Sequence, residues 1–334
     1  AANGEGYFAD TSSGAFTMNL PAGTAGNIVS VVDYTNTFQT NNLTITPNGS
    51  QKIGGIAASF AANTEGQSLT FVYVDDTEGW KNIQDSTSNA TGETFITATG
   101  GTITTSGNFK IHSFTGPGTF CVSALATGPA NNIVDYVVVG GGGNGGGAGN
   151  RGAGGGGAGG YRESPGTTTC YTASPLGASP AVALPVAAAG YPVTVGAGGT
   201  SSPSPVEGNP GSNSVFAGTT TITAAGGGGG GGESPPGTLK DGLPGGSGGG
   251  GGKASSPDGA GGAGNTPSVS PPQGNAGGAG GGGSDASAAG GGGGGASAVG
   301  GVGSSNSGAA GGAGVVSGIT GSNVTRSGGG GGAT

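Results

Sequence analysis

Side chains capable of catalysis are scarce in this sequence. The only histidine, His112, lies in the strand-like run 110–114, and the only cysteines are Cys121 and Cys170. A histidine beside one of the many serines could act as a general base. A lone histidine within a strand pattern instead indicates a structural role, and one histidine with two distant cysteines lacks the usual zinc-ligand spacing. The sequence therefore predicts no catalytic residue, no metal site and no cofactor.

The two cysteines leave two interpretations open. Cys121 and Cys170 form one disulfide in an extracellular particle, or they are two buried small hydrophobic side chains. A disulfide requires their Cα atoms to lie within about 7 Å, which spacing along the chain does not establish.

The densest group of carboxylates is Asp75, Asp76 and Glu78. Carboxylate oxygens are ligands that Ca²⁺ prefers, so a cation site is one interpretation. The same residues with Gly79 have the composition of a hairpin turn, which is the interpretation we favour. The other carboxylates are too scattered for a glycosidase pair to be assigned.

Glycine-rich phosphate loops also need to be considered, because matches to G-x-G-x-x-G recur after Val139. A nucleotide site requires that motif between a strand and a helix. Residues 137–139 supply a strand, but no helix-forming sequence follows them. We attribute the matches to composition.

The chain has few charged residues and a net negative charge. Only 7% of the 334 residues are charged, and the net charge is −8 without a basic cluster. Nucleic-acid binding requires concentrated positive charge, so it is not expected. No stretch approaches the roughly 18 to 20 apolar residues that span a bilayer.

Short alternating apolar runs bounded by turn residues predict an all-β fold with a β-sandwich module over residues 1–92. The run 69–74 is apolar on both faces, which favours a strand covered on both sides by a sheet or a neighbouring subunit. The expected strands are 6–9, 15–20, 28–33, 43–46, 68–74 and 80–83.

A second β domain with glycine-rich insertions is predicted over residues 93–225. The run 133–139 is the most strand-prone of the chain and continues directly into glycine. The other expected strands are 94–98, 101–105, 109–114, 119–124, 191–195, 214–217 and 219–224.

Glycine makes up 88 of the 334 residues, and most of them follow Val139 in uninterrupted runs such as 226–232 and 290–295. Extended glycine can adopt the polyproline II conformation, with three residues per turn and about 3.1 Å rise. Without Cβ atoms such segments approach closely enough for direct backbone hydrogen bonds. Residues 226–334 are therefore predicted to form a polyglycine-II-like tip, with proline-bearing turns projecting from the ends of the bundle.

Seven residues are candidates for contact with a binding partner. Two tyrosines lie in the long insertion 160–189, where they either contact a partner or pack against the glycine segments. The others are polar residues in the loops 233–244, 253–258 and 266–275, since recognition tends to occur on loops held by a rigid scaffold. The candidates are Tyr161, Tyr171, Glu233, Lys240, Lys253, Asp258 and Gln273.

Two stretches resemble tail-fibre and adhesin-like virion proteins of tailed bacteriophages. The first is a small β module carried by the segments 4–14, 20–21, 32–34, 40–45, 48–50 and 72–75. The second is similar to the C-terminal glycine-rich domain of those proteins, and its segments are 95–101, 109–120, 134–139, 159–164 and 191–196. The resemblance implies a homotrimeric fibre with a host-recognition tip, in which loops extend from a polyglycine II bundle.

The sequence thus favours a non-enzymatic virion structural protein that mediates attachment to a bacterial surface glycan or outer-membrane protein. It would be assembled in the bacterial cytoplasm and joined to other virion proteins through an upstream or N-terminal segment. The alternative is a head-decoration or surface-filament subunit without receptor binding. A polysaccharide depolymerase is disfavoured, because no carboxylate constellation for it is evident.

Overall fold

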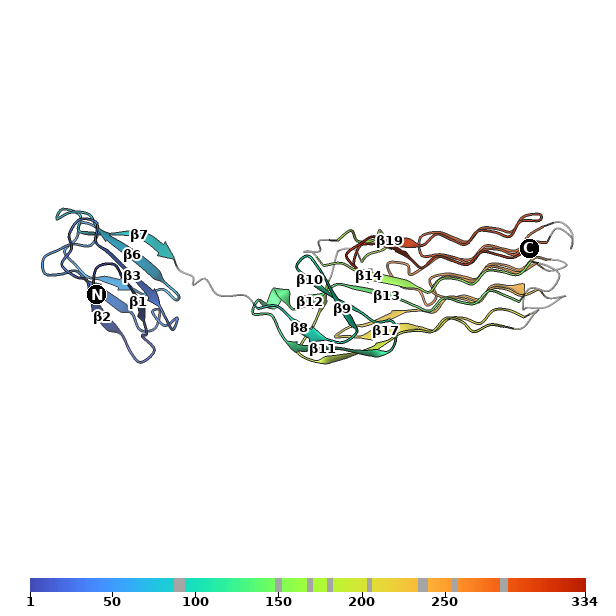
Figure 1. Cartoon of the computed structure of the whole chain (residues 1–334), viewed down its shortest axis with the longest axis horizontal. Coiled ribbons are helices and arrows are strands. Elements are labelled where there is room, and N and C mark those ends of the chain that lie inside the picture. Colours follow the sequence, from blue (N-terminus) through green and yellow to red (C-terminus); the bar gives the residue numbers. More distant parts are fainter. Residues whose placement is uncertain are drawn as a thin grey trace. The chain divides into compact units, whose positions relative to one another are not determined.

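The computed structural model describes residues 1–86, 94–147, 152–166, 171–178, 183–202, 206–233, 240–253, 257–282 and 288–334. The chain divides into two compact units, Ala1–Gly92 and Glu93–Thr334. Each unit is described by itself (Figure 1). The prediction of an all-β fold is confirmed, because strands form nearly all the regular structure beside the short 3₁₀ helix η1 (Pro129–Asn131).

Two sheets form the first unit. A four-stranded sheet has the order β1-β3-β6-β7, and a three-stranded sheet has the order β2-β4-β5. The pairs β1–β3 and β2–β4 are parallel, whereas β3–β6, β6–β7 and β4–β5 are antiparallel. The strands are β1 (Glu5–Ala9), β2 (Phe16–Asn19), β3 (Ile28–Asp33), β4 (Leu43–Thr46), β5 (Phe60–Ala62), β6 (Ser68–Tyr73) and β7 (Trp80–Ser86).

Alternating side chains of both sheets build one core between them. In β3 every second residue is buried, as the two-residue period of a strand requires. Trp80 is fully buried and meets Tyr73 edge to face, with ring centroids 5.5 Å apart. The other large core residues are Leu20, Phe38, Leu43, Ile45, Leu69 and Phe71.

The outer face of the larger sheet is only partly covered. In β6, Leu69, Phe71 and Tyr73 point into the core while the alternate residues are half-buried. Val74, next to the strand, is 43% exposed. Within this chain the run 69–74 is therefore covered on one face, and the predicted second cover is not supplied by a sheet of the same unit.

The second unit begins with a five-stranded sheet of order β18-β17-β16-β11-β8 and a hairpin of β9 with β10. Phe120, Val122, Val186 and Tyr191 form the small core of this part. The strands are β8 (Thr97–Thr99), β9 (Thr102–Ser106), β10 (Phe109–Ser113), β11 (Gly118–Ala124), β16 (Gly190–Thr194), β17 (Ser214–Ala217) and β18 (Thr221–Ala224).

The second unit contains three further strand pairs, and two of them, β13–β14 and β19–β20, adjoin glycine segments. The strand β12 (Ile133–Val134) pairs with β15 (Leu184–Pro185), and β13 (Tyr136–Val139) pairs with β14 (Tyr161–Ser164). Near the C-terminus, β19 (Val315–Ser317) pairs with β20 (Val324–Arg326). Chain segments thus pass from ordinary strand pairs directly into glycine.

The glycine segments pack side by side as an array (Figure 1). Their hydrogen bonds recur at every third residue, as expected for polyproline-II-like segments with three residues per turn. Residues 140–146 donate to residues 154–160 in the pairs Gly140 to Gly160, Gly143 to Gly157 and Gly146 to Gly154, at 2.8–2.9 Å. They are interleaved with a second set to residues 206–212: Gly141 to Ser212, Asn144 to Asn209 and Gly147 to Val206.

The array crosses the boundary that the sequence suggested at residue 225. Gly157 donates to Gly228 at 2.8 Å, and Gly230 donates to Asn144 at 2.9 Å. Residues 93–225 and 226–334 are consequently parts of one unit rather than separate domains.

Close packing is what requires glycine in the array. A Cβ atom added to Gly143 would collide with the carbonyl group of Gly228, and one added to Gly154 would collide with that of Gly250. The neighbouring atoms are backbone, which cannot move aside as the end of a flexible side chain can.

Candidate functional site

At one end of the array, which we call the distal end, several connections between glycine segments lie close together. Backbone hydrogen bonds bring together described residues that flank the connections 148–151, 203–205, 234–239 and 254–256. The bonds run from Gly147 to Val206, Glu233 to Gly147, Gly252 to Lys240 and Lys253 to Gly152. The connections themselves lie outside the described residues. The array therefore fixes the starting points of several loops on one surface.

Three predicted contact residues meet at the distal end. The Lys253 ammonium forms an ion pair with Asp258 at 2.6 Å and donates to the Gly282 carbonyl oxygen at 2.7 Å. The Lys240 ammonium donates to the Pro257 carbonyl oxygen at 2.8 Å. Both lysines thus hold the segment 257–258 in place.

Burial divides these three residues by role. The Lys253 side chain is 7% exposed and the Asp258 side chain 32% exposed. Lys253 is a buried anchor rather than a contact residue. Lys240 and Asp258 are half-buried and retain surface toward solvent.

Glu233 also lies at the distal end, where its amide N–H donates to the Gly147 carbonyl oxygen at 3.3 Å. It is half-buried. The loop 233–244 predicted from sequence is described only at its two ends, and of the loop 253–258 only residue 253 and the residues from 257 onward are described.

Two other predicted contact residues are buried at the opposite, proximal end, where the array meets the sheets. Tyr161 and Gln273 are each 1% exposed. The Tyr161 amide N–H donates to the Gln273 carbonyl oxygen at 2.8 Å. Neither side chain reaches the surface of this unit, so we do not retain them as contact residues.

Gln273 has a structural role instead. Its Oε1 accepts from the Ala225 amide at 2.9 Å, and its Nε2 donates to the Pro267 carbonyl oxygen at 2.8 Å. Asn265 closes the same loop by accepting from the amides of Val269 and Gln273. The predicted recognition loop 266–275 is therefore a folded proximal turn.

A buried polar cluster that sequence patterns did not indicate surrounds Glu163. Its Oε2 accepts from the Tyr161 hydroxyl at 3.0 Å and from the Ser174 amide at 2.9 Å, and its Oε1 accepts from the Ser317 hydroxyl at 2.7 Å. Burial and the nearby Glu163 charge raise the pKa of Tyr161 to about 12. The cluster joins β14, the following insertion and β19. Tyr171, also in the insertion, is half-buried.

The remaining chemistry-bearing residues have structural partners. His112 Nδ1 lies 2.8 Å from the Gly100 carbonyl oxygen, and the imidazole meets Phe120 edge to face. In the turn after β6, Asp75 accepts from the amides of Thr77 and Glu78 at 2.8 Å. This is the hairpin turn favoured from sequence.

Cys121 is a free, exposed cysteine, and Cys170 lies outside the described residues. Within the described ranges, no group of three His, Cys, Asp or Glu residues is arranged to hold a metal ion. The same residues contain no helix long and apolar enough to cross a membrane.

In a comparison with protein families, residues 115–334 match the model of a glycine-rich domain. The matched range begins in β11 and includes the whole array. No curated protein sequence matches the chain.

Proposed function

The chain belongs to the glycine-rich domain family, and on that premise we propose that it is an attachment protein of a tailed bacteriophage, a tail fibre or adhesin. The observation that supports this proposal is the distal end of the array. Backbone hydrogen bonds at every third residue hold several segments in register, and the ends of these segments present adjacent connections. A rigid scaffold with clustered loops suits recognition, because the loops can vary while their bases stay fixed.

The receptor class we propose is a bacterial surface glycan or an outer-membrane protein. Contact would come from the distal connections together with the half-buried residues Glu233, Lys240 and Asp258. Several copies on one particle would raise the avidity of reversible binding without new contacts.

We further propose that copies associate as a trimer through the first unit. The partly covered face of its larger sheet supports this proposal, because Phe8 is 78% exposed and packs edge to face on the exposed Tyr34. Large apolar side chains grouped on a surface are typical of an interaction site. Sedimentation equilibrium should give three times the chain mass, and Phe8→Asp should shift the population toward monomer.

Adsorption tests the attachment proposal. In one virion variant the distal connection 234–239 is replaced by a Gly/Ser sequence of equal length. In the control variant the turn 297–299 is replaced in the same way; it lies at the proximal end, because Ala296 before it packs with Tyr161. We expect normal particle assembly in both variants and loss of adsorption to host cells only in the first.

The opposite outcome favours the head-decoration or surface-filament interpretation. In that case the distal variant fails to assemble, and the purified unaltered chain does not bind host envelope. Release of reducing sugar ends from envelope by the purified chain would indicate a depolymerase.

A further inference from the structure

The array has one vacant position beside its central segment, residues 152–160. This segment is hydrogen-bonded to neighbours on five sides, namely residues 140–147, 225–231, 245–253, 288–296 and 327–333. Gly155 donates to Gly291, and Gly250 donates to Gly155, at 2.9 and 2.8 Å. In a hexagonal packing of three-residue helices, a segment has six neighbours. On the sixth side of this segment lies a groove of about 430 Å³.

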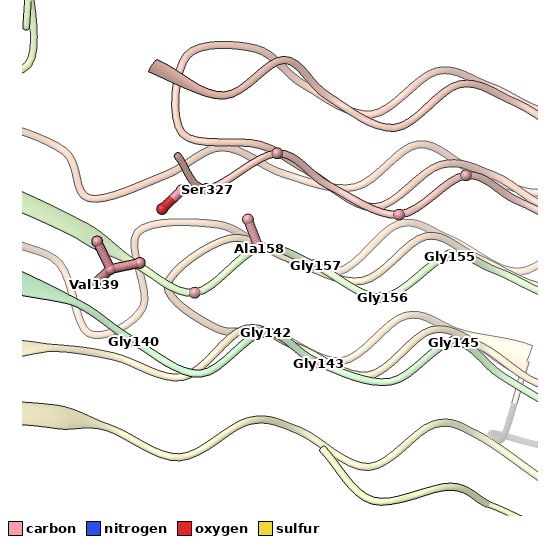
Figure 2. Close-up of a pocket in the computed structure, with 14 residues that line it drawn as sticks. Val139, Gly140, Gly142, Gly143, Gly145, Gly155, Gly156, Gly157, Ala158 and Ser327 are labelled. Atoms are coloured by element: carbon pink, nitrogen blue, oxygen red, sulfur yellow. The ribbon is translucent and has the colours of Figure 1, made fainter. Parts of the chain in front are cut away.

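Backbone atoms line this groove almost entirely (Figure 2). Its floor is residues 155–159, and its walls are residues 140–145 on one side and 327–331 on the other. Ala158 and Val139 contribute the apolar side chains, and Ser327 lies near Val139 (Figure 2). The lining carries no charged side chain.

The hydrogen-bonding pattern identifies which groups lack a partner here. In residues 152–160, one row of amides donates to residues 225–231 and a second row to Gly291 and Gly294; Tyr161, next in the second row, donates to Gln273. The third row includes Gly156 and Gly159, whose amides have no acceptor in the described part of the chain. Because the three rows are about 120° apart, the third row points toward the sixth side.

The walls supply complementary acceptors. The carbonyl oxygens of Gly140 and Gly143 accept no hydrogen bond from the described residues, and the same is true of Gly328 and Gly331. Backbone polar groups are strongly favoured to be paired, so these groups would be satisfied by one more extended segment. That segment would accept from the floor and donate to both walls.

Space for a further segment is evident from the glycines of the groove. A Cβ atom on Gly142 or Gly145 would lie 3.7 or 3.5 Å from the nearest atom outside its own stretch of chain, an ordinary contact distance. At Gly143, in the same segment but facing its neighbours, a Cβ atom would collide with the Gly228 carbonyl group.

We propose that this groove binds an extended glycine-rich segment of a partner polypeptide, which enters as a sixth polyglycine-II-like neighbour of residues 152–160. A glycine-rich sequence is required, because side chains facing the floor or walls would prevent the close approach of the backbones. A polyproline segment is excluded by its rings and its missing N–H donors. An edge segment of a second copy is less suited, since its own neighbours already bond several of its sides.

The test uses the full chain labelled with ¹⁵N and the peptide acetyl-GGGNGGG-amide, which repeats residues 141–147. Amide chemical shifts of Gly156 and Gly159 should move on titration, and the exchange of both amides with solvent should slow. The peptide acetyl-PPPPPPP-amide should move neither amide.

A pair of variants locates the binding. Gly145→Leu places a side chain in the groove. Gly198→Leu is the matched control, because Gly198 lies outside the groove. A Cβ atom on Gly198 also meets no atom closer than 3.6 Å. Loss of several backbone hydrogen bonds at about 1 kcal/mol each should weaken peptide binding at least about tenfold in Gly145→Leu. Gly198→Leu should bind as the unaltered chain does. Equal melting temperatures would show that both arrays are intact.

Three results would overturn the proposal. The first is that neither amide responds to the glycine peptide. The second is that Gly145→Leu binds the peptide as well as Gly198→Leu does. In the third, the two amides become protected only as the chain concentration rises, in step with an increase in mass. That result would assign the groove to a second copy of the chain.

Discussion

The two units of this protein are both packed β structures, but they are held together by different parts of the polypeptide. In the first unit, side chains such as Trp80 and Phe71 fill the space between two sheets. In the array of the second unit, backbone atoms of one segment contact backbone atoms of the next, and hydrogen bonds connect them at every third residue.

This difference changes what each unit tolerates. A side-chain core accepts substitutions that preserve volume and apolar character. A backbone core accepts almost nothing at positions that face a neighbour and many residue types at positions that face solvent. In the array, tolerance therefore alternates along the sequence within a single segment, as Gly142 and Gly143 illustrate.

The largest effect is expected in the side-chain core. Trp80→Ala removes a fully buried side chain and should lower the unfolding free energy of the first unit by about 3–5 kcal/mol. Chemical denaturation followed by tyrosine fluorescence and hydrogen exchange measures the change. If glycine amides of the array lose protection equally, the two units are not independent.

The backbone core should respond to a single methyl group. Gly154→Ala forces a Cβ atom against the backbone of Gly250 and Gly231, and should cost about 1–3 kcal/mol through displaced segments. Gly142→Ala is the control and should change stability by less than about 0.5 kcal/mol. Both variants replace one glycine with alanine, so a difference between their stabilities, measured by calorimetry, reports the packing at each position and not the change in composition. Equal effects would contradict a backbone core.

The buried cluster around Glu163 gives the array a pH dependence. Because the pKa of Tyr161 is about 12 in the folded chain and near 10 when unfolded, the unfolded state releases its proton first. The unfolding free energy should therefore fall as the pH rises from about 10 to 12. Tyr161→Phe should lower stability at neutral pH through its lost hydrogen bond, and should reduce the slope above pH 10. If the unfolding free energy of Tyr161→Phe falls above pH 10 as steeply as that of the unaltered chain, other groups cause the pH dependence.

The smallest effect is expected at the distal end. Asp258→Asn leaves the Lys253 ammonium without its ion pair but keeps its bond to Gly282, and should cost about 1 kcal/mol or less, because Asp258 is partly exposed. Lys253→Met, matched in length, should cost more because two bonds are lost. Thermal unfolding at low and high salt distinguishes the two variants. Salt should remove most of the effect of Asp258→Asn, whereas Lys253→Met should keep the part that comes from the lost bond to Gly282.

Sequence patterns predicted the strands of the first unit well. Six of its strands agree within a few residues with those predicted, because alternating apolar residues are typical of a sheet with one buried face. The short strand β5 was missed, since Phe60-Ala61-Ala62 has no clear alternation. In the second unit β14, β15, β19 and β20 were not predicted, because strands of two to four residues carry too little alternation.

The candidate contact residues could be predicted only in part. The loops bearing Lys240, Lys253 and Asp258 do meet, although composition alone did not reveal that Lys253 would be buried. Tyr161 and Gln273 look like loop residues in the sequence, yet the register of distant segments places them against each other at the proximal end. Register between segments far apart in the chain has no local signal when the segments are nearly pure glycine.

The three-residue repeat also sets rules for how such a sequence can change in length. Inserting three residues into a glycine segment adds one turn, extends the segment by about 9 Å and returns every later residue to its original face. Inserting one residue instead rotates all later residues by about 120° and brings alanine methyl groups, such as those of Ala153 and Ala158, against the wrong neighbours. Length changes in the array should therefore be tolerated in steps of three, whereas the distal connections can gain or lose residues one at a time.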